Sequence, residues 1–158
     1  MTIYSELQQN VTEYRNAQDN FWIDLQTKII PFHNEMLIYF GVAGKTLRFE
    51  DDTETPVIIF GQFINDVFTQ DIPLNLEKDE NDLELKFAVR VLLSKAGSEM
   101  VDTGLTFRCA LGKDESGYRV RFANRTISCP ESNGKLNFKD AFDYILQRLY
   151  QFTDKSKF

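Results

Sequence analysis

The sequence has few of the residues that build metal centres and hydrolytic active sites. Its 158 residues include two cysteines, Cys109 and Cys129, and a single histidine, His33. A zinc site takes three or four such ligands close together, so we expect no metal and no cofactor. Histidine is the usual catalytic base, and His33 lies just after a proline, at a predicted helix kink where a structural role is favoured. These shortages predict a protein that is not an enzyme.

Long apolar runs are also missing. No segment approaches the roughly 18 consecutive apolar residues of a membrane span. The first residues, MTIYSELQQN, lack the basic and apolar regions of a secretory signal. We therefore expect a cytoplasmic protein with no membrane partner. Both cysteines lie in apolar, strand-like runs, where a free cysteine behaves as a small hydrophobic residue, and we predict that both are buried thiols.

Large apolar side chains, in contrast, are abundant. Hydrophobic residues make up 42% of the chain and include 14 Phe, 6 Tyr and one Trp, far more than a disordered acidic tail contains. A chain of this length fits one domain. We predict a single domain over residues 1–158 with one hydrophobic core.

Two segments, one near each end, have the apolar spacing of amphipathic helices. The first runs from Ile3 to Ile29, where a proline follows, and the second follows Asn137. The first pattern is heptad-like, but Gln18 and Lys28 interrupt its seam. Packing of this helix on its own domain is therefore favoured over a coiled-coil dimer. The sequence does not decide between a monomer and a homodimer.

Between the helices, the periodicity of the apolar residues changes to two, as in strands. The predicted strands are residues 46–50, 56–63, 83–93, 104–111 and 118–129. Residues 64–82 have no clear pattern, and the loop KDESG has the length of a hairpin turn. We predict an α+β fold in which an antiparallel sheet of about five strands, connected as a meander, carries both helices on one face.

Strand alternation also assigns the charged residues. If the apolar set points to the core, the basic residues of the last three strands point to the opposite, open face. These residues are Lys86, Arg90, Arg108, Arg119 and Arg121, and Arg125 is expected to rejoin them after a bulge near residues 123–125. Only Glu84 is expected to oppose them. Such a face suits a small anionic ligand, such as a nucleotide or phosphate, because a guanidinium engages two oxygens at once. A merely solvated face is the alternative.

Negative charge concentrates in the first half of the chain. Residues 1–83 hold 5 Lys/Arg and 15 Asp/Glu, a net charge of −10, whereas residues 84–125 carry +3. The two densest acidic segments contain Glu50, Asp51, Asp52 and Glu54, and Asp79, Glu80 and Asp82. Neither has the spacing of a calcium-binding loop. These segments are the predicted protein-binding residues.

The favoured interpretation is a non-enzymatic protein-binding module. In this hypothesis a small acidic inhibitor or toxin-immunity-type protein uses its acidic segments to neutralise a basic or nucleic-acid-acting protein target. The alternatives are a secretion-type chaperone for a partner protein and a binder of a small anionic ligand on the arginine-rich face. Binding of nucleic acid is disfavoured, because the strand aromatics fall on the core side and the acidic half repels phosphate.

Overall fold

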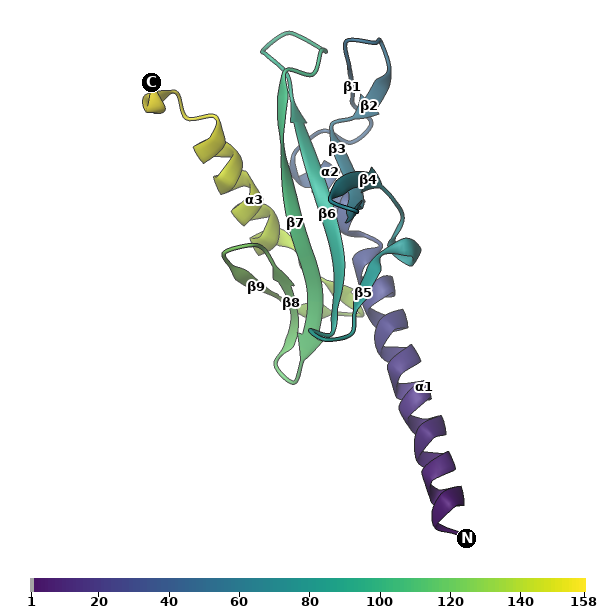
Figure 1. The fold of residues 1–158 in the computed structure, drawn as a ribbon. Coiled ribbons are helices and arrows are strands. Elements are labelled where there is room, and N and C mark those ends of the chain that lie inside the picture. The colour runs from purple at the N-terminus through teal and green to yellow at the C-terminus, as the bar shows by residue number, and fades with distance from the viewer. Residues whose placement is uncertain (1) are drawn as a thin grey trace.

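An antiparallel sheet with helices packed on one face forms the body of the protein (Figure 1). The computed structural model describes residues 2–158. The helices are α1 (Ile3–Ile29), α2 (Phe32–Tyr39) and α3 (Lys139–Phe152), with the 3-10 helices η1 (Pro73–Asn75) and η2 (Lys155–Lys157). The strands are β1 (Thr46–Arg48), β2 (Glu54–Pro56), β3 (Ile58–Ile64), β4 (Val67–Gln70), β5 (Glu77–Asp79), β6 (Glu84–Leu93), β7 (Thr103–Asp114), β8 (Gly117–Arg121), β9 (Thr126–Cys129), β10 (Glu131–Ser132) and β11 (Lys135–Leu136). The predicted α+β class is confirmed.

Seven strands form the main sheet. Their order is β4-β3-β6-β7-β8-β9, and β5 pairs with the edge of β6 that β3 also uses. From β6 to β9, consecutive strands are antiparallel neighbours, so the predicted meander is confirmed for this part of the sheet. The β6–β7 ladder is the longest, from the pair Glu84–Gly112 to the pair Leu93–Thr103.

Two of the predicted strands differ from the structure. The segment predicted at 46–50 contributes only β1, which pairs with β2 in a separate hairpin outside the main sheet. The segment predicted at 118–129 is the β8–β9 hairpin, in which the backbone N–H of Phe122 donates to the carbonyl oxygen of Arg125 at 2.7 Å. This turn explains why the apolar residues before and after it alternate in opposite phase, a change that the sequence analysis interpreted as a bulge. The unassigned residues 64–82 contain β4, η1 and β5.

The core lies between the sheet and the helices and is rich in phenylalanine. Phe32, at the start of α2, is fully buried and makes edge-to-face contacts with Phe87, Phe138 and Phe142 at ring-centroid distances of 5.0, 4.9 and 5.1 Å. Aromatic pairs of this geometry stabilise a fold by about 0.5–1.5 kcal/mol beyond their buried area. Phe32 therefore joins α2, the sheet and α3 in one packed unit.

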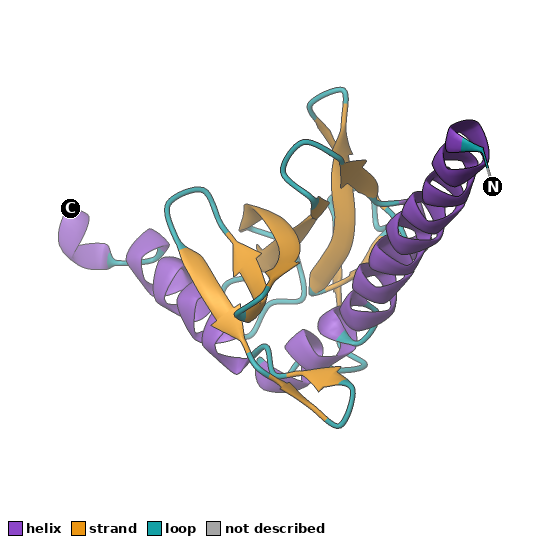
Figure 2. Cartoon of the chain, turned by 90° about the horizontal axis from the view of Figure 1, so that it is seen from below, coloured by secondary structure: helices purple, strands orange, loops and turns teal. Residues whose placement is uncertain are grey.

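Helix α1 has two parts with different surroundings. At its start, the Thr2 hydroxyl accepts a hydrogen bond from the backbone N–H of Ser5 at 3.1 Å, an N-cap. Its last turns pack on the body, and the buried residues there include Trp22 and Leu25. Residues 3–20, which we call the projecting segment, include no buried residue and extend away from the sheet (Figures 1 and 2). The predicted packing of this helix on its own domain holds only for its last third.

Asp24 anchors α1 to the body. Its carboxylate accepts hydrogen bonds from the Lys113 ammonium at 2.7 Å, from the Tyr118 hydroxyl at 2.6 Å and from Lys28 at 3.2 Å. Burial raises the pKa of Asp24, but these three hydrogen bonds outweigh it and leave the pKa below its ordinary value. Burial and the bond to Asp24 raise the pKa of Tyr118 to about 12, so the phenol stays protonated as a donor. The anchor helps to fix the direction in which the projecting segment leaves the body.

Candidate functional site

The two acidic segments predicted as a protein-contact surface lie at opposite ends of the sheet. Residues 50–54 include the turn between β1 and β2. Arg48, just before this turn, forms a parallel β-bridge with Met100 in the connection between β6 and β7. Residues 79–82 comprise the last residue of β5 and the turn that leads to the start of β6. β6 is ten residues long, about 33 Å at the usual rise per residue. The segments are therefore separated by most of the sheet and do not form one continuous surface (Figure 1).

The acidic segment of the β1–β2 hairpin is partly neutralised within the hairpin itself. The Arg48 guanidinium lies 3.8 Å from the carboxylates of both Asp52 and Glu54. Asp51 accepts hydrogen bonds from the side chain and the backbone N–H of Thr53, and these bonds lower its pKa. Two of these carboxylates thus have a basic partner, and a third organises the turn.

The second acidic segment belongs to a larger group of carboxylates. The register that pairs Glu84 with Gly112 brings the β7–β8 turn beside the β5–β6 turn. We define the acidic end as the exposed carboxylates of these two turns. They are Glu80, Asp82, Asp114 and Glu115. Asp114 pairs with Arg119 at 2.9 Å. Across residues 2–158, no ion pair joins a basic side chain to Glu80, Asp82 or Glu115.

Asp79 shapes the turn that carries this group. Its carboxylate accepts hydrogen bonds from the backbone N–H groups of Asn81 and Asp82 at 3.0 and 3.2 Å. It also lies 3.2 Å from the Lys86 ammonium. The bond from the Asp82 backbone and the bond from Lys86 are the main causes of its lowered pKa. Asp79 is therefore a structural carboxylate, and Glu80 and Asp82 are the members of the predicted segment that face outward.

The basic residues of the strands lie opposite the core, as alternation predicted, but several have carboxylate partners that the sequence did not place. The ion pairs are Lys86 with Glu77 and Asp79, Arg108 with Asp66, Arg119 with Asp114, and Arg121 with Glu84. The expectation that Glu84 alone opposes this face is wrong, because turns and β5 bring further carboxylates to it. Arg125 does not rejoin the face: it lies in the β8–β9 turn, with its guanidinium 5.9 Å from the ring of Tyr144 on α3.

Two aromatic rings also lie on the arginine-rich face. The guanidinium of Arg108 is 3.7 Å from the ring centroid of Phe63, and that of Arg90 is 4.3 Å from the ring of Phe68. The prediction that the strand aromatics fall on the core side is wrong for Phe63, and Phe68 lies in residues 64–82, to which no strand was assigned. Phe60 takes the core side of β3, so Phe63, three residues later, points to the open face. These cation–π contacts hold two of the arginines against the sheet.

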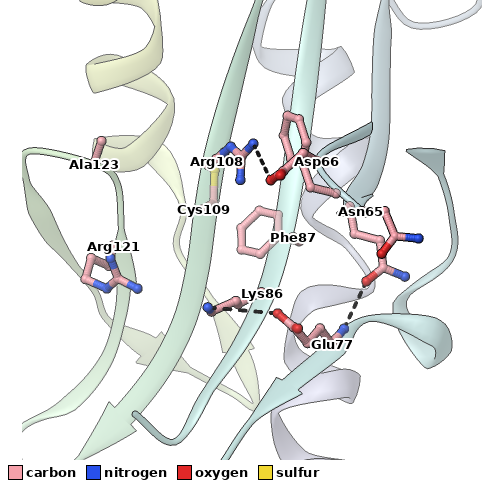
Figure 3. Close-up of a pocket in the computed structure, with 11 residues that line it drawn as sticks. Asn65, Asp66, Glu77, Lys86, Phe87, Arg108, Cys109, Arg121 and Ala123 are labelled. Atoms are coloured by element: carbon pink, nitrogen blue, oxygen red, sulfur yellow. Dashed lines mark hydrogen bonds and ion pairs between the residues drawn. The ribbon is translucent and has the colours of Figure 1, made fainter. Parts of the chain in front are cut away.

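The open face is hollowed into a cavity of about 490 Å³ (Figure 3). Lys86, Arg108 and Arg121 line it. Beside it, the buried carboxylate of Glu84 accepts hydrogen bonds from Nε and Nη2 of Arg121 at 3.1 and 2.9 Å, and these bonds raise the pKa of the guanidinium. Every cation that lines the cavity has a carboxylate partner. The cavity is therefore polar but close to neutral, which weakens its attraction for an anion.

The residues with the greatest chemical reactivity occupy structural positions. His33 Nε2 lies 2.7 Å from the carbonyl oxygen of Ile58, a contact that ties α2 to β3. Cys109 and Cys129 are free and buried, as predicted, and burial raises the pKa of both thiols, that of Cys129 to about 11. Over residues 2–158, no group of three or more His, Cys, Asp or Glu side chains is arranged to hold a metal ion. None of the helices in this range has the length and apolar character needed to cross a membrane.

The sequence reasoning missed the surface that the projecting segment offers. Its apolar residues are exposed instead of packed on the domain. They are Ile3, Tyr4, Leu7, Val11 and Tyr14, between 53% and 78% exposed. The heptad-like spacing was the available signal, because that spacing is typical of a helix that packs against another helix.

Comparison of the chain with protein-family models, with curated proteins and with solved structures finds no match. The geometry of the chain alone therefore supports the functional proposal.

Proposed function

We propose that this protein is a non-enzymatic protein-binding module that neutralises a basic, nucleic-acid-acting protein, in the manner of a small inhibitor or a toxin-immunity protein. The observation that carries the proposal is a contrast in charge pairing. The cations that line the open-face cavity are matched by carboxylates within the chain, whereas Glu80, Asp82 and Glu115 have no ion-pair partner among residues 2–158. The acidic end is the proposed contact surface.

Electrostatics explains why such a surface suits this kind of target. A protein that binds or cleaves nucleic acid needs a cationic cleft for the phosphates. Exposed carboxylates on a rigid turn complement that cleft, and long-range attraction speeds the encounter. The Asp79 hydrogen bonds hold the β5–β6 turn in one conformation. Little conformational entropy is then lost when the turn binds.

The positions of the reactive side chains support a non-enzymatic role. A nucleophile needs a base within hydrogen-bond reach. His33 is engaged with a backbone carbonyl oxygen, and neither buried thiol has a lowered pKa. Binding is the activity that this arrangement favours.

The structure supplies a matched experiment, because the two acidic segments lie at opposite ends. Glu80, Asp82 and Glu115 are replaced by Lys in one variant, and Glu50, Asp51 and Glu54 in the other, so the change in net charge is identical. Each protein is used to capture partners from the native host, and association with the captured protein is measured at several salt concentrations. We expect the first variant to lose the partner, or to bind it slowly with little salt dependence, and the second to behave like the wild type. Equal behaviour of the two variants would contradict the proposal.

A secretion-type chaperone is the second candidate function, and one observation favours it. Such chaperones commonly dimerise through an apolar surface, and the projecting segment exposes one. A chaperone would hold its client partly unfolded, whereas an inhibitor binds a folded target. Limited proteolysis of the captured partner, free and in the complex, separates these two functions. The anionic-ligand alternative is weaker, because the three cations that line the open-face cavity, Lys86, Arg108 and Arg121, already have carboxylate partners.

A further inference from the structure

The exposed apolar residues of the projecting segment continue a stripe that is part of the core further along α1. Tyr4, Leu7, Val11, Tyr14, Gln18, Phe21 and Leu25 follow one another at alternating spacings of three and four. This is the seam of a heptad repeat. Leu25 is fully buried against the body, and the side chains before Phe21 are not. The same face of the helix is therefore covered by the sheet at one end and left uncovered at the other.

The projecting segment needs a partner to remain helical. It is 18 residues long, about 27 Å, and most of the stability of a helix in a protein comes from tertiary packing of its apolar face. Its composition adds little helical preference, because it contains three asparagines, a valine and a threonine. The apolar face of this segment is exposed in every copy of the chain. A second copy is always present, and it is therefore the simplest partner that could cover this face.

The seam is also complementary to itself. The acidic residues Glu6, Glu13 and Asp19 all lie at least about 100° around the helix from the centre of the seam, because successive residues are rotated by about 100°. Two copies can therefore bring their seams together without opposing carboxylates, although the whole chain has a net charge of −6. The seam face of a copy is thus an apolar surface without flanking carboxylates, and Arg15 is the one charged residue beside it within residues 4–20.

The position of the body decides the orientation. Around Leu25, the seam face is filled by the chain's own sheet, so a parallel copy would place its helix where that sheet lies. In an antiparallel pair, the helix of the second copy ends at the point along α1 where the chain's own sheet starts to cover the seam. The second helix and the sheet therefore do not overlap. We propose that the protein is a homodimer in which residues 4–21 of two copies pack antiparallel, with Tyr4 of each copy near Phe21 of the other.

The size of the contact is consistent with a stable dimer. The exposed apolar seam residues of each copy would be covered, which are the tyrosines Tyr4 and Tyr14 and the aliphatic residues Leu7 and Val11. A tyrosine buries roughly 150–250 Å² when it is fully covered. With the aliphatic side chains, the total approaches the roughly 1,200 Å² at the lower end of specific interfaces. Gln18, the polar residue of the seam, would restrict the register, as polar seam residues do in coiled coils.

The first experiment measures the mass of the full chain by light scattering. We expect the mass of two chains for the wild type and of one chain for Leu7→Glu/Val11→Glu. The control Gln9→Glu/Asn16→Glu adds the same charge on the outer face and should keep the mass of two chains. Fluorescence of Trp22, which is buried in the body, verifies that each variant is folded. A one-chain wild type, or a seam variant that keeps the mass of two chains, would overturn the inference.

The second experiment tests the orientation by oxidative cross-linking. Both native thiols are buried, so one introduced cysteine is the reactive group. Val11→Cys lies near the dimer axis and should form a cross-linked dimer. Tyr4→Cys lies far from its counterpart in an antiparallel pair and should not. Cross-linking of Tyr4→Cys as fast as Val11→Cys would show a parallel pair. The seam and the acidic end carry different variants, so failure of this inference is distinguishable from failure of the proposed function.

Discussion

Leu7 and Leu25 are the same residue type on the same face of the same helix, yet their surroundings are opposite. They are 18 residues apart, about five turns of α-helix. Leu25 is 0% exposed and Leu7 is 53% exposed. The comparison shows that helical periodicity identifies an apolar face but not what covers it. Whether the apolar face is buried depends on where the sheet ends, which is a property of the tertiary structure.

The largest expected effect is the loss of packing at the covered end. Leu25→Ala should lower the free energy of unfolding by about 2–5 kcal/mol, the usual range for a fully buried leucine. Leu7→Ala, at a concentration too low for association, should change it by less than about 0.5 kcal/mol. Denaturant unfolding followed by Trp22 fluorescence measures both. Equal effects would show that the projecting segment packs on the body.

A second prediction concerns the anchor between the two parts of α1. Asp24→Asn removes a carboxylate that accepts charged hydrogen bonds, and it should cost about 1.5–3 kcal/mol. Asp19→Asn, little more than one turn earlier in the projecting segment, is the control and should be nearly neutral. Thermal unfolding of both variants provides the comparison. An effect of Asp19→Asn as large as that of Asp24→Asn would remove the distinction between the two parts.

The smallest effect is a dependence on pH. The pKa of Asp24 is lowered in the folded protein, so its contribution is complete above the ordinary carboxyl pKa, near 4, and is lost as the pH falls through the lowered value. The stability difference between wild type and Asp24→Asn should therefore shrink as the pH is lowered below about 4. Unfolding curves from neutral to acidic pH measure this difference. A difference that stays constant would mean that Asp24 has the same pKa in both states.

Local pattern predicted the α+β class, the two terminal helices and the outward direction of the strand arginines, because each depends on neighbours along the chain. It did not predict the carboxylates opposite Lys86 and Arg108. Those carboxylates come from β5 and from the β3–β4 turn, inside residues 64–82, and their positions depend on pairing with distant strands. For the same reason, the β8–β9 turn was interpreted as a bulge. The acidic end was found only in part, because Glu115 joins it through the register of β6 and β7.

The Asp24 anchor also has a consequence for the order of folding. Its hydrogen bonds to Lys113 and Tyr118 span 89 and 94 positions of the chain. Closing a loop of that length has a large entropic cost, whereas the β7–β8 hairpin closes over a few residues. The hairpin should therefore be formed in the folding transition state before α1 docks on it. Substitutions at Asp24 should then mainly accelerate unfolding, with refolding rates close to those of the wild type.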